Sequence, residues 1–138
     1  YQRLCEKKNL SLKFIQHPEK FAVVTDFNLL ECILQNLVTN AIDYTPAAGK
    51  IDVLLENRNN LVVIQVKDTG IGIPKNEQSR VFERFTRASN AVIAKTDGTG
   101  LGLYIAQQAA KLLGGKLSFE SEVGKGSTFF VEFPGRFS

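Results

Sequence analysis

Two segments of the chain place apolar residues at intervals of three and four, the spacing of a helix that covers a core. The first covers residues 27–44, and Asp26 stands before it as a residue that can cap its free N–H groups. The second covers residues 101–113 and stops at a Gly-Gly pair. A shorter helix or helical turn is expected over 75–85, and residues 1–8 are expected to be a linker or the tail of a preceding helix.

Alternation of apolar and polar residues predicts the strands. Their expected ranges are 10–14, 21–24, 51–55, 61–66, 116–121 and 128–133. The sequences NRNN and VGKGS predict hairpin turns in the middle and near the end of the chain, and residues 86–100 predict a mobile loop. The pattern indicates an α+β fold, a two-layer sandwich with a mixed, mostly antiparallel sheet of about five strands and about three helices on one face.

Composition indicates one globular domain covering residues 1–138, because 43% of the residues are hydrophobic and 22% are charged. No apolar run reaches bilayer-spanning length and no secretory signal is present, so we expect no membrane contact. Cys5 and Cys32 are not in a metal-like spacing and indicate reduced thiols of a cytoplasmic domain. A net charge of +3 is too small to favour nucleic acid. The start without methionine favours a fragment of a longer protein, whose anchorage in the inner membrane stays open.

Polar residues beside the apolar stripe of the first helix form a candidate site. Asn36, Asn40 and Asp43 lie together on one flank, although asparagine is a poor helix former. Such a position suits side chains that line the edge of a cleft. The alternative is that they are surface residues or bond a neighbouring turn, and the helix taken alone favours that alternative.

Glycine-rich segments supply three more candidates. In DTGIGI (68–73), Asp68 closes a strand and can accept a hydrogen bond from an exocyclic amine such as that of adenine; alternatively it caps the next helix. In GTGLGL (98–103), free N–H groups at a helix start favour a phosphate site over a plain flexible loop. GKGST (124–128) taken alone favours a simple hairpin turn.

In this order and spacing, these segments resemble the catalytic ATP-binding domain of bacterial sensor histidine kinases, which belongs to the GHKL superfamily with DNA gyrase and MutL. NLVTNAIDYTP resembles the N box, VFERF the F box, and DTGIGI, GTGLGL and GKGSTF the three glycine boxes. The resemblance covers about residues 10–133 and implies the Bergerat ATP-binding fold. It also implies that Mg-ATP donates its γ-phosphoryl group to a histidine on a separate dimerisation domain, with a response regulator as an indirect partner.

The resemblance implies roles for individual residues. Asn40 would hold Mg²⁺ against the phosphates, and Asn36 would line the same cleft where hydrolysing relatives carry a glutamate base. Asp68 would bind the adenine amine, with Thr128 nearby through water, and Phe82 and Phe85 would anchor the lid. The other expected nucleotide contacts are Asp43, Tyr44, Gly70, Gly72, Ile73, Arg84, Phe85, Arg87, Lys95, Gly98, Thr99, Gly100, Leu101, Gly102 and Leu103.

Asp43 departs from the family pattern, which usually has a basic residue after NAI. A carboxylate near phosphates is repulsive unless Mg²⁺ or its waters lie between them. Two alternatives therefore stand beside the histidine kinase prediction. One is a nucleotide- or partner-binding GHKL module without phosphotransfer, and the other is a GHKL serine kinase of the anti-sigma type. The complete F box and the long lid argue against the serine kinase.

Overall fold

The computed structural model describes residues 1–17, 23–89 and 100–137. Its elements, in chain order, are α1 (Gln2–Lys7), β1 (Ser11–His17), β2 (Val23–Val24), α2 (Phe27–Tyr44), β3 (Lys50–Arg58), β4 (Leu61–Asp68), the 3₁₀ helix η1 (Lys75–Arg80), α4 (Gly102–Leu112), β5 (Lys116–Glu122), β6 (Gly126–Pro134) and β7 (Arg136–Phe137). The loop predicted over 86–100 lies for the most part outside the described residues.

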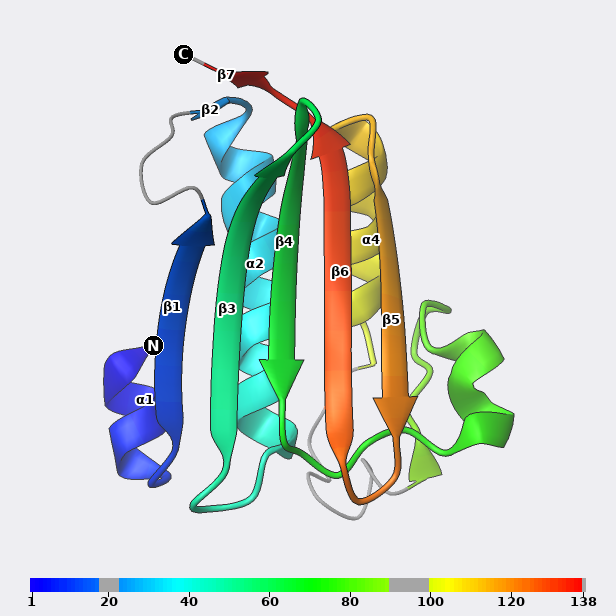
Figure 1. The fold of residues 1–138 in the computed structure, drawn as a ribbon. Helices are drawn as coiled ribbons and strands as arrows, with labels where there is room; N and C mark the ends of the chain where they lie inside the picture. The colour runs from blue at the N-terminus through cyan, green and yellow to red at the C-terminus, as the bar shows by residue number, and fades with distance from the viewer. Residues whose placement is uncertain (18–22, 90–99, 138) are drawn as a thin grey trace.

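Five strands form one mixed sheet in the order β1-β3-β4-β6-β5 (Figure 1). β1 runs parallel to β3, and the other neighbouring pairs are antiparallel. The short strands β2 and β7 form a separate antiparallel pair. The predicted fold class, with its mostly antiparallel sheet, is confirmed.

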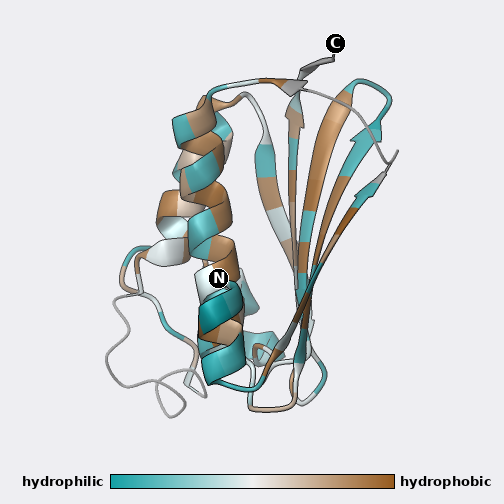
Figure 2. Cartoon of the chain, turned by 90° about the vertical axis from the view of Figure 1, so that its left-hand side faces the viewer, coloured by the Kyte–Doolittle hydropathy of each residue, from teal (hydrophilic) through white to brown (hydrophobic). Residues whose placement is uncertain are grey.

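The helices lie on one side of this sheet, and the other face is open (Figure 2). α2 and α4 pack on each other and on the sheet, and α1 adds the fully buried Cys5 to the same core. The largest fully buried aromatic side chains are Phe129 and Phe133 of β6. The C-terminal end of α2 and the N-terminal end of α4 therefore meet at the same end of the sandwich.

Helix α2 begins and ends at the predicted residues. Asp26 caps it by accepting a hydrogen bond from the Leu29 N–H at 3.1 Å. Ile33 is fully buried on this helix, whereas Leu30 and Leu34 are only half-buried. α4 packs against α2, so this helix has a second neighbour besides the sheet.

The hairpin between β3 and β4 is tighter than the four-residue NRNN turn predicted. The strands extend to Arg58 and Leu61, and only Asn59 and Asn60 form the turn. Both have positive φ, 52° and 67°, as a type I′ turn requires. No helix within the described parts of the chain has the length and apolar character needed to cross a membrane.

Candidate functional site

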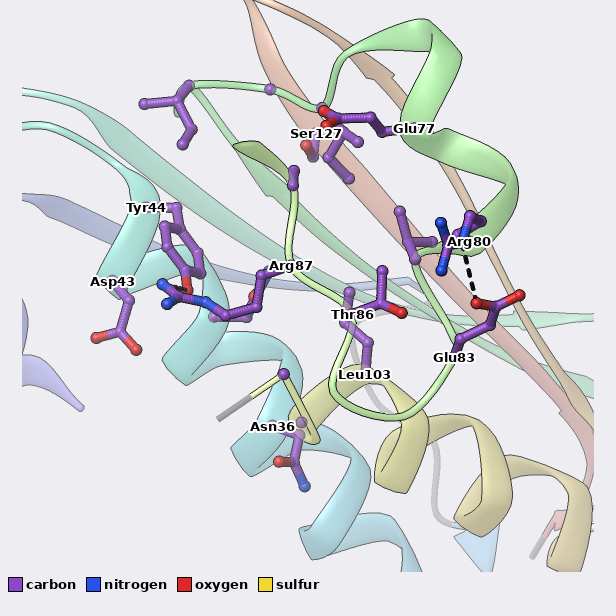
Figure 3. Close-up of a pocket in the computed structure, with 18 of the residues that line it drawn as sticks. Asn36, Asp43, Tyr44, Glu77, Arg80, Glu83, Thr86, Arg87, Leu103 and Ser127 are labelled. Atoms are coloured by element: carbon purple, nitrogen blue, oxygen red, sulfur yellow. Dashed lines mark hydrogen bonds and ion pairs between the residues drawn. The ribbon is translucent and has the colours of Figure 1, made fainter. Parts of the chain in front are cut away.

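A cavity of about 690 Å³ opens where α2 ends and α4 begins, a usual size for a small-molecule site (Figure 3). Its other walls come from the loop after β4, from η1 and from the residues that follow η1. The lining residues are Asn36, Thr39, Asn40, Asp43, Tyr44, Asp68, Ile71, Gly72, Ile73, Asn76, Glu77, Arg80, Val81, Glu83, Arg84, Phe85, Thr86, Arg87, Ala88, Gly100, Gly102, Leu103 and Ser127.

The two asparagines of α2 both line the cavity but are held differently. The Asn36 Nδ2 donates to the Cys32 carbonyl at 2.8 Å, so it does bond the preceding turn. Its Oδ1 faces α4, and a Cβ added at Gly102 would lie 3.3 Å from it. The Asn40 amide has no hydrogen-bond partner among the described residues and is available to a ligand.

Asp68 ends β4 inside the protein, and its exposed fraction is only 6%. Its Oδ1 accepts hydrogen bonds from the Gly70 N–H at 2.8 Å and the Ser127 N–H at 3.3 Å. The hydrogen bonds of the described residues leave Oδ2 available as an acceptor. Burial raises the pKa of this carboxyl, and the two N–H groups oppose that rise only in part. A buried carboxylate that lines a cavity is a functional-site candidate.

Ser127, and not Thr128, is the β6 residue beside Asp68. The two lie opposite each other in the β4–β6 register. Successive residues of a strand point to opposite faces, so Thr128 lies on the open face and outside the cavity lining. The Ser127 and Ser121 hydroxyls lie 2.7 Å apart, which holds Ser127 in place. Thr128 is therefore not part of the lining, and the water-mediated contact that the resemblance implied for it stays a prediction.

Two glycines are required by close backbone contacts at the rim of the cavity. Gly72 has φ +73°, and a Cβ there would collide with the Glu122 carbonyl oxygen. Gly100 has φ +72°, and a Cβ there would come within 2.7 Å of the Phe85 backbone. The second contact joins the residues after η1 to the start of α4.

The two phenylalanines of the VFERF segment behave differently from each other. Phe82 packs edge-on against Phe119 with 5.6 Å between ring centroids, and Phe119 stacks on Phe129. Phe85 instead has φ +60° and an exposed fraction of 71%. Phe82 is thus packed into the domain while the Phe85 ring is exposed, and the lid-anchoring role that the resemblance implied for both residues stays a prediction.

Arginine side chains gather on the walls of the cavity. The Arg87 Nη2 donates to the Tyr44 hydroxyl at 3.3 Å, close to Asp43 in Figure 3. The Arg84 guanidinium lies over the Tyr104 ring at 5.0 Å from its centroid. Fixed guanidinium groups of this kind suit phosphate groups of a ligand.

Two carboxylates of the η1 wall have partners within the protein. Glu83 accepts from the Arg80 Nε at 3.1 Å, and both side chains are exposed. Glu77 accepts from the Ser89 N–H and from its hydroxyl, at 3.3 and 3.2 Å. These contacts tie η1 to the residues that follow it.

The cavity brings together most of the predicted site residues. Those that line it are Asn36, Asn40, Asp43, Tyr44, Asp68, Gly72, Ile73, Arg84, Phe85, Arg87, Gly100, Gly102 and Leu103. Gly70, Leu101 and Thr128 are not part of the lining, although Gly70 helps to hold Asp68. Lys95, Gly98 and Thr99 lie outside the described residues.

Sequence reasoning missed several wall residues. Ser127 could have been found from strand alternation, because it follows Gly126 and must face the same side as Phe129. Thr39 shares the helix flank of Asn36 and Asn40 and could have been found in the same way. Arg80 and Glu77 could not be predicted as cavity residues, because a polar 3₁₀ segment has no sequence pattern that indicates a cavity.

Asp68 makes the stability of the fold depend on pH. Its pKa is raised above the usual 3.8, so the folded state holds the proton more tightly than the unfolded state. Its contribution is fully present below pH 3.8 and is lost as the pH rises through the folded-state pKa. We expect Asp68→Asn to remove this pH dependence. The free energy of unfolding of the wild type should therefore fall relative to that of Asp68→Asn from about pH 4 to 7.

Urea unfolding of both proteins across this pH range measures the effect. A constant difference between wild type and Asp68→Asn at every pH would contradict the assignment of the titration to Asp68.

Comparison with known proteins gives the relatives of this chain. The family described as histidine kinase-, DNA gyrase B- and HSP90-like ATPase matches residues 25–136. Sensor histidine kinase RppB of Synechocystis is 45% identical over 102 residues, which cover 74% of this chain and 22% of RppB. The chain therefore spans less than a quarter of that relative's length.

Two solved structures show the same fold. The catalytic domain of histidine kinase ThkA superposes with a TM-score of 0.81 and 30% identity, covering 96% of this chain and 85% of that one. Full-length ShkA in complex with AMPPNP superposes with a TM-score of 0.84 and 27% identity, covering 99% of this chain and 28% of that one. ThkA is also known in complex with the response regulator protein TrrA, and that kinase chain superposes on this one with a TM-score of 0.78.

Proposed function

Because the chain belongs to the histidine kinase-, DNA gyrase B- and HSP90-like ATPases, with sensor histidine kinases among its relatives, we propose that it is the catalytic domain of a two-component kinase. It binds Mg-ATP and transfers the γ-phosphoryl group to a histidine on a separate dimerisation domain, which in turn serves a response regulator. The observation that carries this proposal is Asp68, a buried carboxylate with a free oxygen in a cavity of nucleotide size.

Adenine is recognised at the Asp68 end of the cavity. The exocyclic amine of adenine is a donor, and the Asp68 Oδ2 is the acceptor that the protein leaves available. Ile73 offers an apolar surface nearby, and the Ser127 hydroxyl offers a second polar contact. A site that buries an acceptor for one donor rejects bases that lack the donor.

The phosphate groups lie toward the start of α4. Gly100 and Gly102 line the cavity at the helix N-terminus, where backbone N–H groups can meet a phosphate, and Arg84 and Arg87 add positive charge from the residues after η1. The helix extends over 11 residues from Gly102, so its dipole also favours negative charge at this end. We assign Lys95, Gly98 and Thr99 to the same role from the family resemblance alone.

The residues present fit a magnesium ion that is held mainly by the substrate. The described residues contain no cluster of three or more histidine, cysteine or acidic side chains, so the protein does not form a complete ion cage there. Mg²⁺ keeps several waters and takes few protein ligands when phosphates supply the rest. The Asn40 side chain is the ligand that this site offers, and the ion would neutralise charge on the transferring phosphate.

Asn36 is the reason why the proposed site does not hydrolyse ATP. Its amide cannot serve as a general base, and its Nδ2 is already bonded to the Cys32 carbonyl. Water near the γ-phosphate therefore receives no activation from this position, and the ATP is preserved for the acceptor histidine. Catalysis then consists of positioning and charge stabilisation.

Titration calorimetry of the chain with Mg-ATP tests the proposal. We expect saturable binding with one site, and weaker binding of Mg-GTP, because guanine carries a carbonyl where adenine carries the amine. The absence of Mg-ATP binding by the folded chain would overturn the proposal.

The Asp43 carboxylate at the cavity wall also bears on the alternative of a binding module without phosphotransfer. We expect Asp43→Asn to tighten Mg-ATP binding by about 1 kcal/mol, because it removes a charge that repels the phosphates. The gain should shrink as salt is added. Calorimetry at two salt concentrations measures this gain in affinity. Asp52→Asn, which also removes a carboxylate but lies outside the cavity lining, is the control. Weaker binding by Asp43→Asn would show that this carboxylate takes a productive part in the site.

A further inference from the structure

The last turn of α2 is held by contacts from outside the helix. The last four carbonyls of a helix have no partner within it and must be bonded by other groups. The Thr45 hydroxyl donates to the Ala41 carbonyl at 2.6 Å, and the Ile71 N–H donates to the Tyr44 carbonyl at 3.1 Å. The Ile71 contact joins the turn to the loop that forms the next wall of the cavity.

The other two carbonyls both accept hydrogen bonds from one lysine that is distant in the sequence. The Lys8 Nζ donates to the Ile42 carbonyl at 2.8 Å and to the Asp43 carbonyl at 3.0 Å. The last turn of α2 contains no basic residue of its own, and Asp43 adds negative charge where the helix dipole is already negative. Lys8 therefore supplies both the donors and the positive charge that this helix end lacks.

Lys8 is itself fixed by the N-terminal helix. It follows α1 directly, and its backbone N–H donates to the Leu4 carbonyl at 3.2 Å. Cys5 of α1 is fully buried in the core, so the helix has a fixed position on the domain. Asn9 adopts φ +58°, and its carbonyl accepts from the Ala48 N–H at 2.8 Å, which ties the same turn to the loop after α2.

We propose that Lys8 is a positioning residue of the nucleotide site and couples α1 to nucleotide binding. It does not line the cavity, but it bonds the turn that carries the Asp43 and Tyr44 side chains into the cavity wall. Any displacement of α1 from the domain must break these two bonds and release that turn. By linkage, nucleotide binding must then favour the docked position of α1 to the same extent. This inference rests on the proposed function.

The test compares Lys8→Met, which keeps the aliphatic stem and removes the donors, with Lys7→Met, the exposed neighbour on the same helix end. Mg-ATP affinity is measured by calorimetry at a temperature where circular dichroism shows each protein to be folded. We expect Lys8→Met to weaken binding by about fivefold, at the low end of typical coupling factors, and Lys7→Met to bind as the wild type does. Lys8→Arg retains charge and donors and should recover most of the affinity.

Hydrogen exchange supplies a readout that a loss of global stability alone would not produce. In Lys8→Met, exchange should rise locally over residues 41–45, and Mg-ATP should no longer slow exchange in α1. Should Lys8→Met not fold, Lys8→Gln replaces it in the same comparison. If the wild type binds Mg-ATP and the Lys8 variant binds equally well, this inference alone is overturned. If the wild type does not bind, the proposed function is overturned as well.

Discussion

Asp68→Asn should bind Mg-ATP about tenfold to a hundredfold more weakly than the wild type while remaining folded. The Oδ1 of the new amide can still accept from the Gly70 and Ser127 N–H groups that hold the native side chain. The amide nitrogen then faces the cavity, where it opposes the donor amine of adenine. The reverse orientation would point this nitrogen at the two N–H donors, so it is disfavoured. Loss of a hydrogen bond to a charged group costs about 1.5–3 kcal/mol, which gives the expected range.

The same substitution should change the choice of base. Guanine has an acceptor carbonyl at the position of the adenine amine, and an amide donor can bond to it. The preference for Mg-ATP over Mg-GTP should therefore narrow in Asp68→Asn, and calorimetry with both nucleotides measures the ratio. An unchanged ratio, or normal Mg-ATP affinity, would refute the assignment of Asp68 to the base.

The structure also shows why alanine is the wrong substitution at this position. The Asp68 Oδ1 bonds two backbone N–H groups in a buried setting, so alanine would leave both without a partner. Each unsatisfied buried donor costs about 1–3 kcal/mol. A binding defect in that variant could therefore come from a damaged loop.

The second prediction concerns the activity of this chain in the absence of a dimerisation domain. We expect it to bind Mg-ATP but neither to phosphorylate itself nor to release phosphate at an appreciable rate. His17 lacks the surroundings of a phosphoacceptor, and Asn36 provides no general base. Addition of the parent protein's dimerisation domain as a separate chain should produce histidine phosphorylation. That reaction should be slow, because a covalent link normally provides the effective concentration.

Labelled ATP distinguishes these outcomes. Acid-labile label should appear only on the added domain, and Asn40→Ala should suppress it, because the protein then loses its ligand for Mg²⁺. Gln35→Ala, at an exposed position of the same helix and outside the cavity lining, is the control. Acid-labile label on the isolated chain, or rapid release of free phosphate, would contradict the proposed division of labour.

The sequence predicted those features that depend on interactions between residues close together in the chain. The bounds of α2 follow from Asp26 as a cap and from the Thr-Pro pair that ends it, and both act within a few residues. The five-stranded sheet follows from alternation and turn residues. The cavity also emerged at the predicted segments, because each segment ends an element at the same end of the sandwich.

The features that sequence did not predict depend on contacts between distant residues. Lys8 bonds carbonyls 34 and 35 positions away, and no pattern around Lys8 indicates that contact. The burial of Ile33 depends on how α2 packs against α4 and the sheet, which the helical periodicity of α2 does not contain. The positive φ of Phe85 and the high exposure of its side chain are likewise not indicated by the VFERF segment.

The contact between Gly100 and the Phe85 backbone has a consequence for the length of the chain between them. Because these two residues lie against each other, the two ends of the chain between them are close together. The entropy of closing a loop with fixed ends changes slowly with its length, and doubling the length costs only about 0.6 kcal/mol. The fold that carries the cavity should therefore tolerate insertions between Ser89 and Gly100.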